Sequence, residues 1–334
     1  MKSINVVILQ YPGAMKSAVE GLRELFDLAS RLSQEQQVEL SFNIKVLENS
    51  ELSDSELSDS ELSDSELSGT DLECRADSQF DRIPQVIIIP PCITGSFYTD
   101  EQHLITPWLK VMHASGSILC SVCAGAFILA QTGLLNQRPA TTHWILAERL
   151  ANNFPEVLVD ENKILINDGD LITAGGLMAW LDMGLELVAQ FGSPALMRLL
   201  GKRLVVDTAP RQQRYYRCFI PPFDHGDKAI LKSQHYLQSY SHTSVTVKQL
   251  ATDSYLTERT FLRRFVQATG YKPKEYMQNL RISKACEALE GSSDSIEVIS
   301  LNVGYDDVSA FRKVFIKIVG LTPREFRGRF SSVK

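Results

Sequence analysis

An internal repeat with a spacing of 50 residues organises the last hundred residues of the chain. Aromatic residues, glycine and proline recur in the same order in both copies. Each copy predicts a short helix, a tight turn and a second helix with phenylalanine at positions i and i+4. The matched pairs are Phe261 and Phe311, Phe265 and Phe315, Gly270 and Gly320, Pro273 and Pro323, and Tyr276 and Phe326.

Two helices joined by a brief turn form a helix-turn-helix motif, whose second helix enters the major groove of DNA. We place the two motifs at about residues 247–269 and 296–319. A helical bundle with a solvated charged face does not account for two matched units that both end in Gly-x-x-Pro. The side chains expected to pack inward are Phe261, Leu262 and Phe265 in the first motif, and Phe311, Val314 and Phe315 in the second.

The other faces of these second helices are polar and largely basic, so they provide the candidate DNA contacts. They are Glu258, Arg259, Thr260, Arg263 and Arg264 in the first motif, and Ser309, Ala310, Arg312, Lys313 and Lys317 in the second.

The formal net charge of the chain, −6, is unusual for a protein that binds a polyanion. The charge is unevenly divided, however. Residues 241–334 hold 15 Lys and Arg against 10 Asp and Glu, whereas residues 1–240 hold 19 against 30. Basic charge is therefore concentrated at the end that carries the repeat, as contact with phosphates requires.

Residues 228–330 resemble the AraC/XylS regulator family, most closely in VKQLATDSYLTERTFLRRF and IEVISLNVGYDDVSAFRKVFIKIVGLTPREFR. The resemblance implies an all-α double helix-turn-helix domain over residues 228–334. It would present two recognition helices to successive major-groove faces about one helical turn, roughly 34 Å, apart. Ser300 departs from the family pattern, which commonly has alanine there, but serine is small enough to pack.

The first 200 residues alternate apolar strands with amphipathic helices, which predicts an α/β domain of flavodoxin-like type over residues 1–206. Such a domain has a mostly parallel sheet with helices on both faces. Residues 207–227, rich in proline and arginine, are the expected linker. The predicted strands are 4–9, 40–46, 86–89, 118–122, 140–142 and 171–173, and the first helix is 18–32.

Residues 51–69 consist of a tandem five-residue repeat, ELSDS, which matches neither the helical nor the strand period. Residues 48–77 contain 11 acidic residues and a single arginine, a composition that disfavours collapse. We predict a disordered surface insertion at residues 49–77. It is either a simple loop expansion or an acidic arm for phosphorylation or partner binding.

The segment SILCSVCAGAFILAQTG, residues 117–133, predicts a strand that turns sharply into a helix at Cys123, as in a nucleophile elbow. A cysteine at a helix N-terminus is activated by position, because the helix dipole favours the thiolate. Gly125 would provide the clearance that the turn needs. His143 follows the next predicted strand, which would put it beside Cys123 as a minimal thiol pair.

This domain resembles the PfpI-like branch of the class I glutamine amidotransferases across residues 4–206. The resemblance is closest to the GlxA-type regulators, which fuse that domain to an AraC-type domain. Three departures argue against catalysis. Ala124 stands where the PfpI-type proteases have a histidine directly after the nucleophile. Ala18 or a neighbour stands where relatives have an acidic residue near the thiol, unless Glu20 reaches in. Pro90 and Pro91 stand where relatives have glycines whose amides form an oxyanion hole, and proline has no N–H to donate.

We therefore predict no catalytic residues, no metal and no cofactor, but a retained effector pocket at the carboxyl ends of the parallel strands. Cys123 would line that pocket, with an inert structural relic and a reactive or redox-sensing thiol as alternatives. His143 would line it too, unless it is a structural imidazole. The predicted pocket residues are Gly13, Ala14, Cys92, Cys123, Ala124 and His143.

The sequence thus predicts a cytoplasmic, ligand-responsive transcription regulator that is not an enzyme and has no membrane partner. Its expected partners are promoter DNA, RNA polymerase and a second copy of the chain bound through the N-terminal domain. The expected effector is a small nitrogenous metabolite, because the relatives that this architecture resembles respond to such molecules. The main alternative is a thiol-dependent hydrolase or amidotransferase-like enzyme using Cys123 and His143. Purely architectural DNA binding is disfavoured by the pocket-bearing α/β domain.

Overall fold

A computed structural model describes residues 2–38, 40–52, 83–209 and 211–332. The chain forms two compact units, Met1–Gln213 and Arg214–Lys334. The predicted linker, residues 207–227, is shared between them. Its first residues complete the N-terminal unit, and the rest packs in the C-terminal unit.

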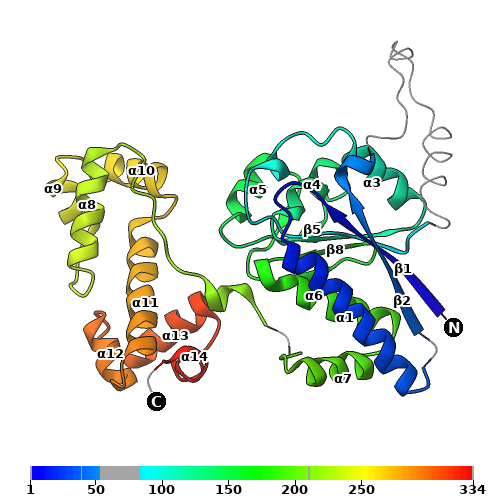
Figure 1. The fold of residues 1–334 in the computed structure, drawn as a ribbon. Helices are drawn as coiled ribbons and strands as arrows, with labels where there is room; N and C mark the ends of the chain where they lie inside the picture. The colour runs from blue at the N-terminus through cyan, green and yellow to red at the C-terminus, as the bar shows by residue number, and fades with distance from the viewer. Residues whose placement is uncertain (1, 39, 53–82, 210, 333–334) are drawn as a thin grey trace, which may run out of the picture. The chain divides into compact units, whose positions relative to one another are not determined.

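A six-stranded sheet forms the centre of the N-terminal unit, in the order β2-β1-β3-β4-β8-β7 (Figure 1). All strands are parallel except β7 at the edge, which pairs antiparallel with β8. The sheet is covered on both faces, so every residue of β3 is buried and its sequence is an unbroken apolar run. The strands are β1 (Lys2–Gln10), β2 (Leu40–Glu48), β3 (Val86–Ile89), β4 (Ile118–Val122), β7 (Leu165–Asn167) and β8 (Leu171–Ala174).

Helices cover both faces of this sheet, as the strand–helix alternation predicts. The first, α1 (Lys16–Glu35), buries one apolar stripe that includes Leu22, Phe26 and Leu32. Figure 1 shows α1 and α6 on one face and α3 and α4 on the other. The remaining helices of the unit are α3 (Ile105–Ala114), α4 (Gly125–Gln131), α5 (Ala147–Asn153), α6 (Trp180–Phe191) and α7 (Pro194–Leu204).

The predicted strand at residues 140–142 is wrong in extent and in place. Only β5 (Pro139–Ala140) is extended, and it pairs with β6 (Leu158–Val159) in a separate two-stranded sheet. The reason is that the Thr141 amide donates a hydrogen bond to the Thr173 side-chain hydroxyl instead of to a neighbouring strand backbone. The residues after β5 therefore approach the main sheet without joining it.

The predicted disordered insertion at 49–77 begins too early. Asn49–Leu52 form a short 3-10 helix, η1, and Leu52 is buried against the core. The turn is held by the buried Leu52 at the end of η1 and by the Glu51 carboxylate, which accepts a hydrogen bond from the Glu48 amide. The rest of the predicted insertion, including nearly all of the ELSDS repeat, lies outside the described residues.

The regular secondary structure described in the C-terminal unit is all helical, and its α-helices follow a non-helical segment at residues 217–227. Its two motifs are the pairs α9–α10 and α12–α13, and both recognition helices, α10 and α13, end at a glycine in the left-handed conformation, Gly270 and Gly320. The helices are α8 (Lys228–Ser239), α9 (Val247–Asp253), α10 (Glu258–Thr269), α11 (Pro273–Gly291), α12 (Ile296–Asn302), α13 (Val308–Val319) and α14 (Pro323–Phe330).

The long helix α11 joins the two motifs, and Arg281 on it ties them together. Its guanidinium donates hydrogen bonds of 2.6 and 2.9 Å to the carbonyls of Ser241 and Thr243, before α9, and one of 2.7 Å to the carbonyl of Gly304, in the turn of the second motif. Three charge-assisted bonds from one guanidinium therefore hold the α8–α9 connection and the turn of the second motif to the same helix.

Candidate DNA interface and effector site

The buried aromatic residues of each motif set the rotation of its recognition helix. In α10, Phe261 and Phe265 are fully buried, and the Tyr276 ring meets Phe265 edge-on at 5.3 Å. In α13, Phe315 meets Phe326 edge-on at 5.7 Å. Because the same contact recurs in both copies, the two recognition helices turn equivalent faces outward.

The outward faces carry most of the predicted DNA-contacting residues. Arg259 and Arg263 are exposed on α10, and Lys313 and Lys317 are exposed on α13. Arg312 is also exposed, although its guanidinium lies 3.1 Å from the Glu297 carboxylate on α12. An exposed ion pair of this kind is weak and leaves the arginine available to a phosphate or a base.

Two residues of the first recognition helix differ from expectation. Leu262 was expected to pack inward, but its side chain is 39% exposed, because the buried face of α10 is fully occupied by Phe261 and Phe265. Arg264 binds Asp227, the N-cap of α8, through two hydrogen bonds of 2.8 and 2.6 Å. The guanidinium of Arg264 therefore holds α8 against α10 and is not free to contact DNA.

Two exposed basic residues, Lys274 and Arg324, were not among the predicted DNA contacts. They stand at matched positions of the repeat, in the first turns of α11 and α14 directly after the recognition helices. The 50-residue spacing itself was the signal that could have found them.

The nucleophile elbow is present in the backbone. Cys123 follows β4 and has a φ of 55°, a left-handed conformation that a non-glycine residue adopts only when its surroundings enforce it. Its amide donates a 2.8 Å hydrogen bond to the carbonyl of Ala174. Gly125 provides the predicted clearance, since a Cβ there would lie 2.7 Å from the carbonyl oxygen of Ile89.

The thiol at this elbow is not activated. Cys123 is only 3% exposed, and burial raises the pKa of its thiol to about 12, although a hydrogen bond from the Ala124 backbone acts in the opposite direction. The expectation that the helix N-terminus favours a thiolate is therefore wrong for this site, because desolvation outweighs it. Burial raises the pKa of the neighbouring Cys92 as well.

His143 does not pair with Cys123. Its Nδ1 accepts a hydrogen bond from the Ile145 amide, and among the described residues no hydrogen bond joins it to the thiol. The residue that reaches the elbow is Thr142, whose hydroxyl donates a 2.7 Å hydrogen bond to the Cys123 carbonyl. Burial lowers the pKa of the His143 imidazole, which favours the neutral ring.

Carboxylate support for the thiol is also missing from the described part of the chain. Glu20, the only nearby substitute that the sequence offered for the missing acid, forms an exposed ion pair of 3.0 Å with Arg23. The Pro90 carbonyl accepts a hydrogen bond from the Tyr11 hydroxyl, and that of Pro91 accepts one from the Met15 amide. This edge of the site therefore offers occupied carbonyls where an oxyanion hole needs free N–H donors.

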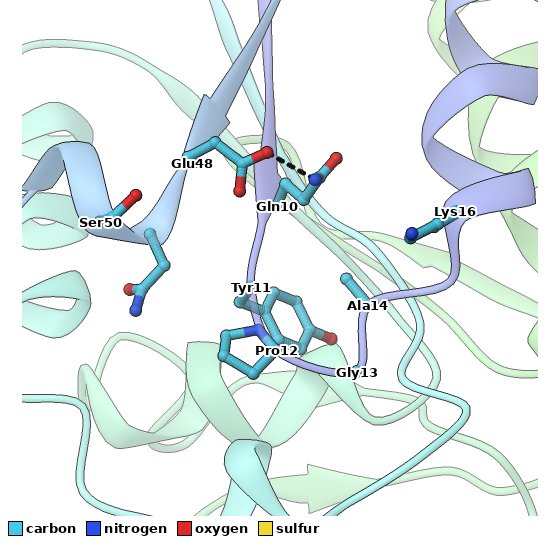
Figure 2. A pocket seen from close by; sticks show the side chains of 9 residues that line it. Gln10, Tyr11, Pro12, Gly13, Ala14, Lys16, Glu48 and Ser50 are labelled. Atoms are coloured by element: carbon cyan, nitrogen blue, oxygen red, sulfur yellow. Dashed lines mark hydrogen bonds between the residues drawn. The ribbon is translucent and has the colours of Figure 1, made fainter.

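A pocket of about 390 Å³ lies at the carboxyl ends of β1 and β2. Figure 2 shows the Gln10 amide bonded to the Glu48 carboxylate, and Lys16 reaching in from the start of α1. Gln10 and Glu48 are register partners on adjacent parallel strands, so the sheet itself places them together. The lining residues are Gln10, Tyr11, Pro12, Gly13, Ala14, Lys16, Glu48, Asn49 and Ser50.

Of the predicted effector residues, only Gly13 and Ala14 line this pocket. Cys92 lies directly behind them, because a Cβ at Gly13 would be 2.9 Å from its sulfur and a β-bridge joins it to Ala14. Cys123 and Ala124 are buried at the neighbouring strand end, and His143 belongs to the loop after β5. The charged residues Lys16 and Glu48 were missed because neither belongs to a recognisable motif.

Across the residues that the structure describes, no group of three or more His, Cys, Asp and Glu side chains is placed to hold a metal ion. No helix in the same part of the chain combines the length and apolarity that crossing a membrane needs.

Comparison with known proteins gives two family matches, one within each unit. Residues 32–190 match the DJ-1/PfpI family, and residues 250–329 match a helix-turn-helix domain family. The chain is 25% identical over 224 residues to the HTH-type transcriptional regulator CdhR of Pseudomonas aeruginosa, covering 67% of this chain and 66% of that protein. The chain thus spans about two thirds of that relative's length.

Two further relatives show the range of proteins that share these domains. The HTH-type transcriptional regulator GlxA of Rhizobium meliloti is 24% identical over 225 residues, covering 67% of this chain and 69% of the relative. Isonitrile hydratase of Pseudomonas putida is 29% identical over 162 residues, covering 47% of this chain and 63% of the relative. Relatives therefore include both regulators and an enzyme.

The thiol of Cys123 should resist alkylation at neutral pH. Because its pKa is raised to about 12, the rate of reaction with iodoacetamide should rise about tenfold per pH unit between pH 7 and 9 without a plateau. Mass spectrometry resolves this site from the exposed Cys218. A plateau below pH 8 would instead reveal an activated thiolate.

Replacing Arg263 and Arg264 in turn by methionine should separate DNA contact from structure. Arg263→Met should weaken DNA binding about tenfold and leave the melting temperature unchanged. Arg264→Met should lower the melting temperature, because it removes the partner of Asp227. Binding isotherms and thermal melts measure both effects, and identical changes in the two variants would contradict this assignment.

The Arg264 effect should also depend on pH. The hydrogen bonds from Arg264 hold the pKa of Asp227 below its ordinary value of 3.8. The ionised carboxylate thus contributes stability above that value, and the contribution is lost as the pH falls through the folded-state pKa. The difference in melting temperature between wild type and Arg264→Met should therefore shrink on acidification.

Proposed function

The chain joins a DJ-1/PfpI domain to a helix-turn-helix domain of the AraC type, and from this architecture we propose that it is a transcription regulator that reads promoter DNA and responds to a small effector. The regulators among its relatives, CdhR and GlxA, support the proposal. Binding to promoter DNA would place the protein in the cytoplasm.

The observation that carries the proposal is the duplicated recognition helix. Both helices are seated by buried phenylalanines, both expose basic side chains, and Arg281 ties the two motifs to one connecting helix. Two equivalent surfaces held by one rigid element fit a two-part site on one duplex. The proposed base and phosphate contacts are Glu258, Arg259, Thr260, Arg263, Lys274, Ser309, Ala310, Arg312, Lys313, Lys317 and Arg324.

The effector site that we propose is the pocket between β1, β2 and α1. It presents a carboxylate on Glu48, an ammonium on Lys16 and the aromatic residue Tyr11. A small molecule that carries both a cationic nitrogen and a carboxylate would satisfy both charges. This chemistry agrees with the nitrogenous metabolites expected from the sequence.

An enzymatic role is the second candidate, supported by the elbow backbone at Cys123 and by the likeness to isonitrile hydratase. The protonated thiol and the separate position of His143 speak against it. We therefore propose that the domain acts as a receptor. Dimerisation through this domain and contact with RNA polymerase complete the proposal.

Selection of duplexes from a random-sequence pool by the full-length protein tests the DNA-reading role. A regulator should enrich a two-part site with half-sites about one helical turn apart, and affinity for it should fall steeply with salt. Recovery of unselected, salt-labile DNA would contradict sequence-specific regulation. Failure of the Arg259→Ala and Lys313→Ala variants to change the enriched sequence would contradict the assigned helices.

Thermal-shift screening with free amino acids and quaternary amines tests the effector pocket. A ligand that raises the melting temperature should bind about tenfold more weakly to Glu48→Gln or Lys16→Met, because each variant removes one charge-assisted hydrogen bond. Glu24→Gln, an exposed change on the same helix as Lys16, is the control. Equal affinity in all variants would place the effector elsewhere.

A further inference from the structure

The side chain of Gln213, the last residue of the N-terminal unit, is inserted into that unit and is only 2% exposed. Its carboxamide nitrogen donates hydrogen bonds of 2.8 Å to the carbonyls of Thr142 and Lys163, and a longer one to the Thr141 hydroxyl. Its carboxamide oxygen accepts one of 3.2 Å from the Trp144 amide. Both ends of the carboxamide are thus recognised.

The shape of this niche depends on Gly175. A Cβ at that position would lie 2.0 Å from the carboxamide nitrogen of Gln213, so any side chain there would expel the group. The neighbouring Gly176 has open space at the equivalent point. Acceptor oxygens face one end of the niche and an N–H faces the other, which suits a neutral primary carboxamide and disfavours a carboxylate.

The niche shares residues with the Cys123 elbow. Thr142 accepts the Gln213 amide through its carbonyl and donates its hydroxyl to the Cys123 carbonyl. Gly175 directly follows Ala174, whose carbonyl accepts the Cys123 amide. A ligand that shifts the elbow would therefore act on the hydrogen bonds of Gln213.

The residues on either side of Gln213 are held as well. Before it, Arg211 forms a two-bond ion pair with Asp182 at the start of α6. After it, the side chain of Arg214 lies over Gly320 in the C-terminal unit, and Tyr216 accepts a 3.0 Å hydrogen bond from Arg329. The last side chain held by the N-terminal unit, that of Gln213, and the first held by the C-terminal unit, that of Arg214, therefore belong to consecutive residues.

We propose that the niche is a binding site for a carboxamide and that the side chain of Gln213 occupies it as a latch. The latch is the bound side chain, and its release would lengthen the free chain between the effector domain and the DNA-binding domain. Release of Arg211–Gln213 would add three residues, about 10 Å of extended chain. Effector binding that weakens the niche would lengthen the tether by this amount. The inference goes beyond the proposed regulator function and does not depend on which DNA is bound.

Two variants of the full-length protein should remove the Gln213 side chain from the niche in different ways. Gly175→Ala fills the niche, and Gln213→Ala empties it. Both should accelerate tryptic cleavage at the Arg211–Gln212 bond about tenfold, since several hydrogen bonds that oppose local opening are lost. Gly176→Ala should be cleaved at the wild-type rate. The measured quantity is the rate of cleavage after Arg211 divided by the rate of cleavage after Arg149 in α5. This ratio corrects for a general loss of stability.

Acetamide rescue tests the chemistry of the niche. Acetamide replaces the atoms that Gln213→Ala removes, so it should slow cleavage of that variant towards the wild-type rate. It should have no effect on Gly175→Ala, whose niche is filled, and acetate should rescue neither variant.

Cleavage ratios equal to wild type in both variants would overturn the latch. Rescue of Gln213→Ala by acetate as well as acetamide would overturn the carboxamide specificity. Neither readout involves DNA, so a failure of the latch is distinguishable from a failure of the proposed regulator function.

Discussion

The burial of two phenylalanines one helical turn apart is the constraint on which the DNA-reading surface depends. Phe261 and Phe265 fix the rotation of α10, and Phe311 and Phe315 do the same for α13. With the apolar face committed to the core, Arg263, Arg312 and Lys313 between these phenylalanines are exposed, whereas Arg264 is bound to Asp227 of α8. Arg281 ties the connection before α9 and the turn of the second motif to α11, which holds the two motifs together within the C-terminal unit. Two such surfaces fit a duplex that carries a two-part site.

The N-terminal unit keeps the backbone of a thiol site and lacks its chemistry. The left-handed Cys123 and the clearance at Gly125 preserve the elbow, but desolvation leaves the thiol protonated and the surrounding carbonyls are already occupied. Two other features lie at this edge of the sheet. A charged pocket lies on one side, at Glu48 and Lys16, and a filled carboxamide niche lies on the other, at Gln213. Thr142 joins the niche to the elbow, because its carbonyl accepts the Gln213 amide and its hydroxyl donates to the Cys123 carbonyl.

Much of this fold could be predicted from sequence, because the decisive signals are periodic. The phenylalanine spacing and the Gly-x-x-Pro exits predict the helices of both motifs, and the apolar run at residues 86–89 predicts a buried parallel strand. The side-chain environment was less predictable. Leu262 is exposed because two phenylalanines fill its face, Arg264 is engaged by an aspartate 37 residues away, and Cys123 is governed by burial instead of by its helix. Such properties depend on contacts between residues distant in sequence, which local patterns do not encode.

Hydroxyl-radical footprinting of the full-length protein on an enriched duplex tests the central claim most directly. If α10 and α13 of one molecule read one duplex, each bound molecule should protect two backbone patches on the same face, with centres about one helical turn, 10 to 10.5 base pairs, apart. Arg263→Met should weaken one patch and Lys313→Ala the other. A single patch, or protection that both variants weaken equally, would contradict the account.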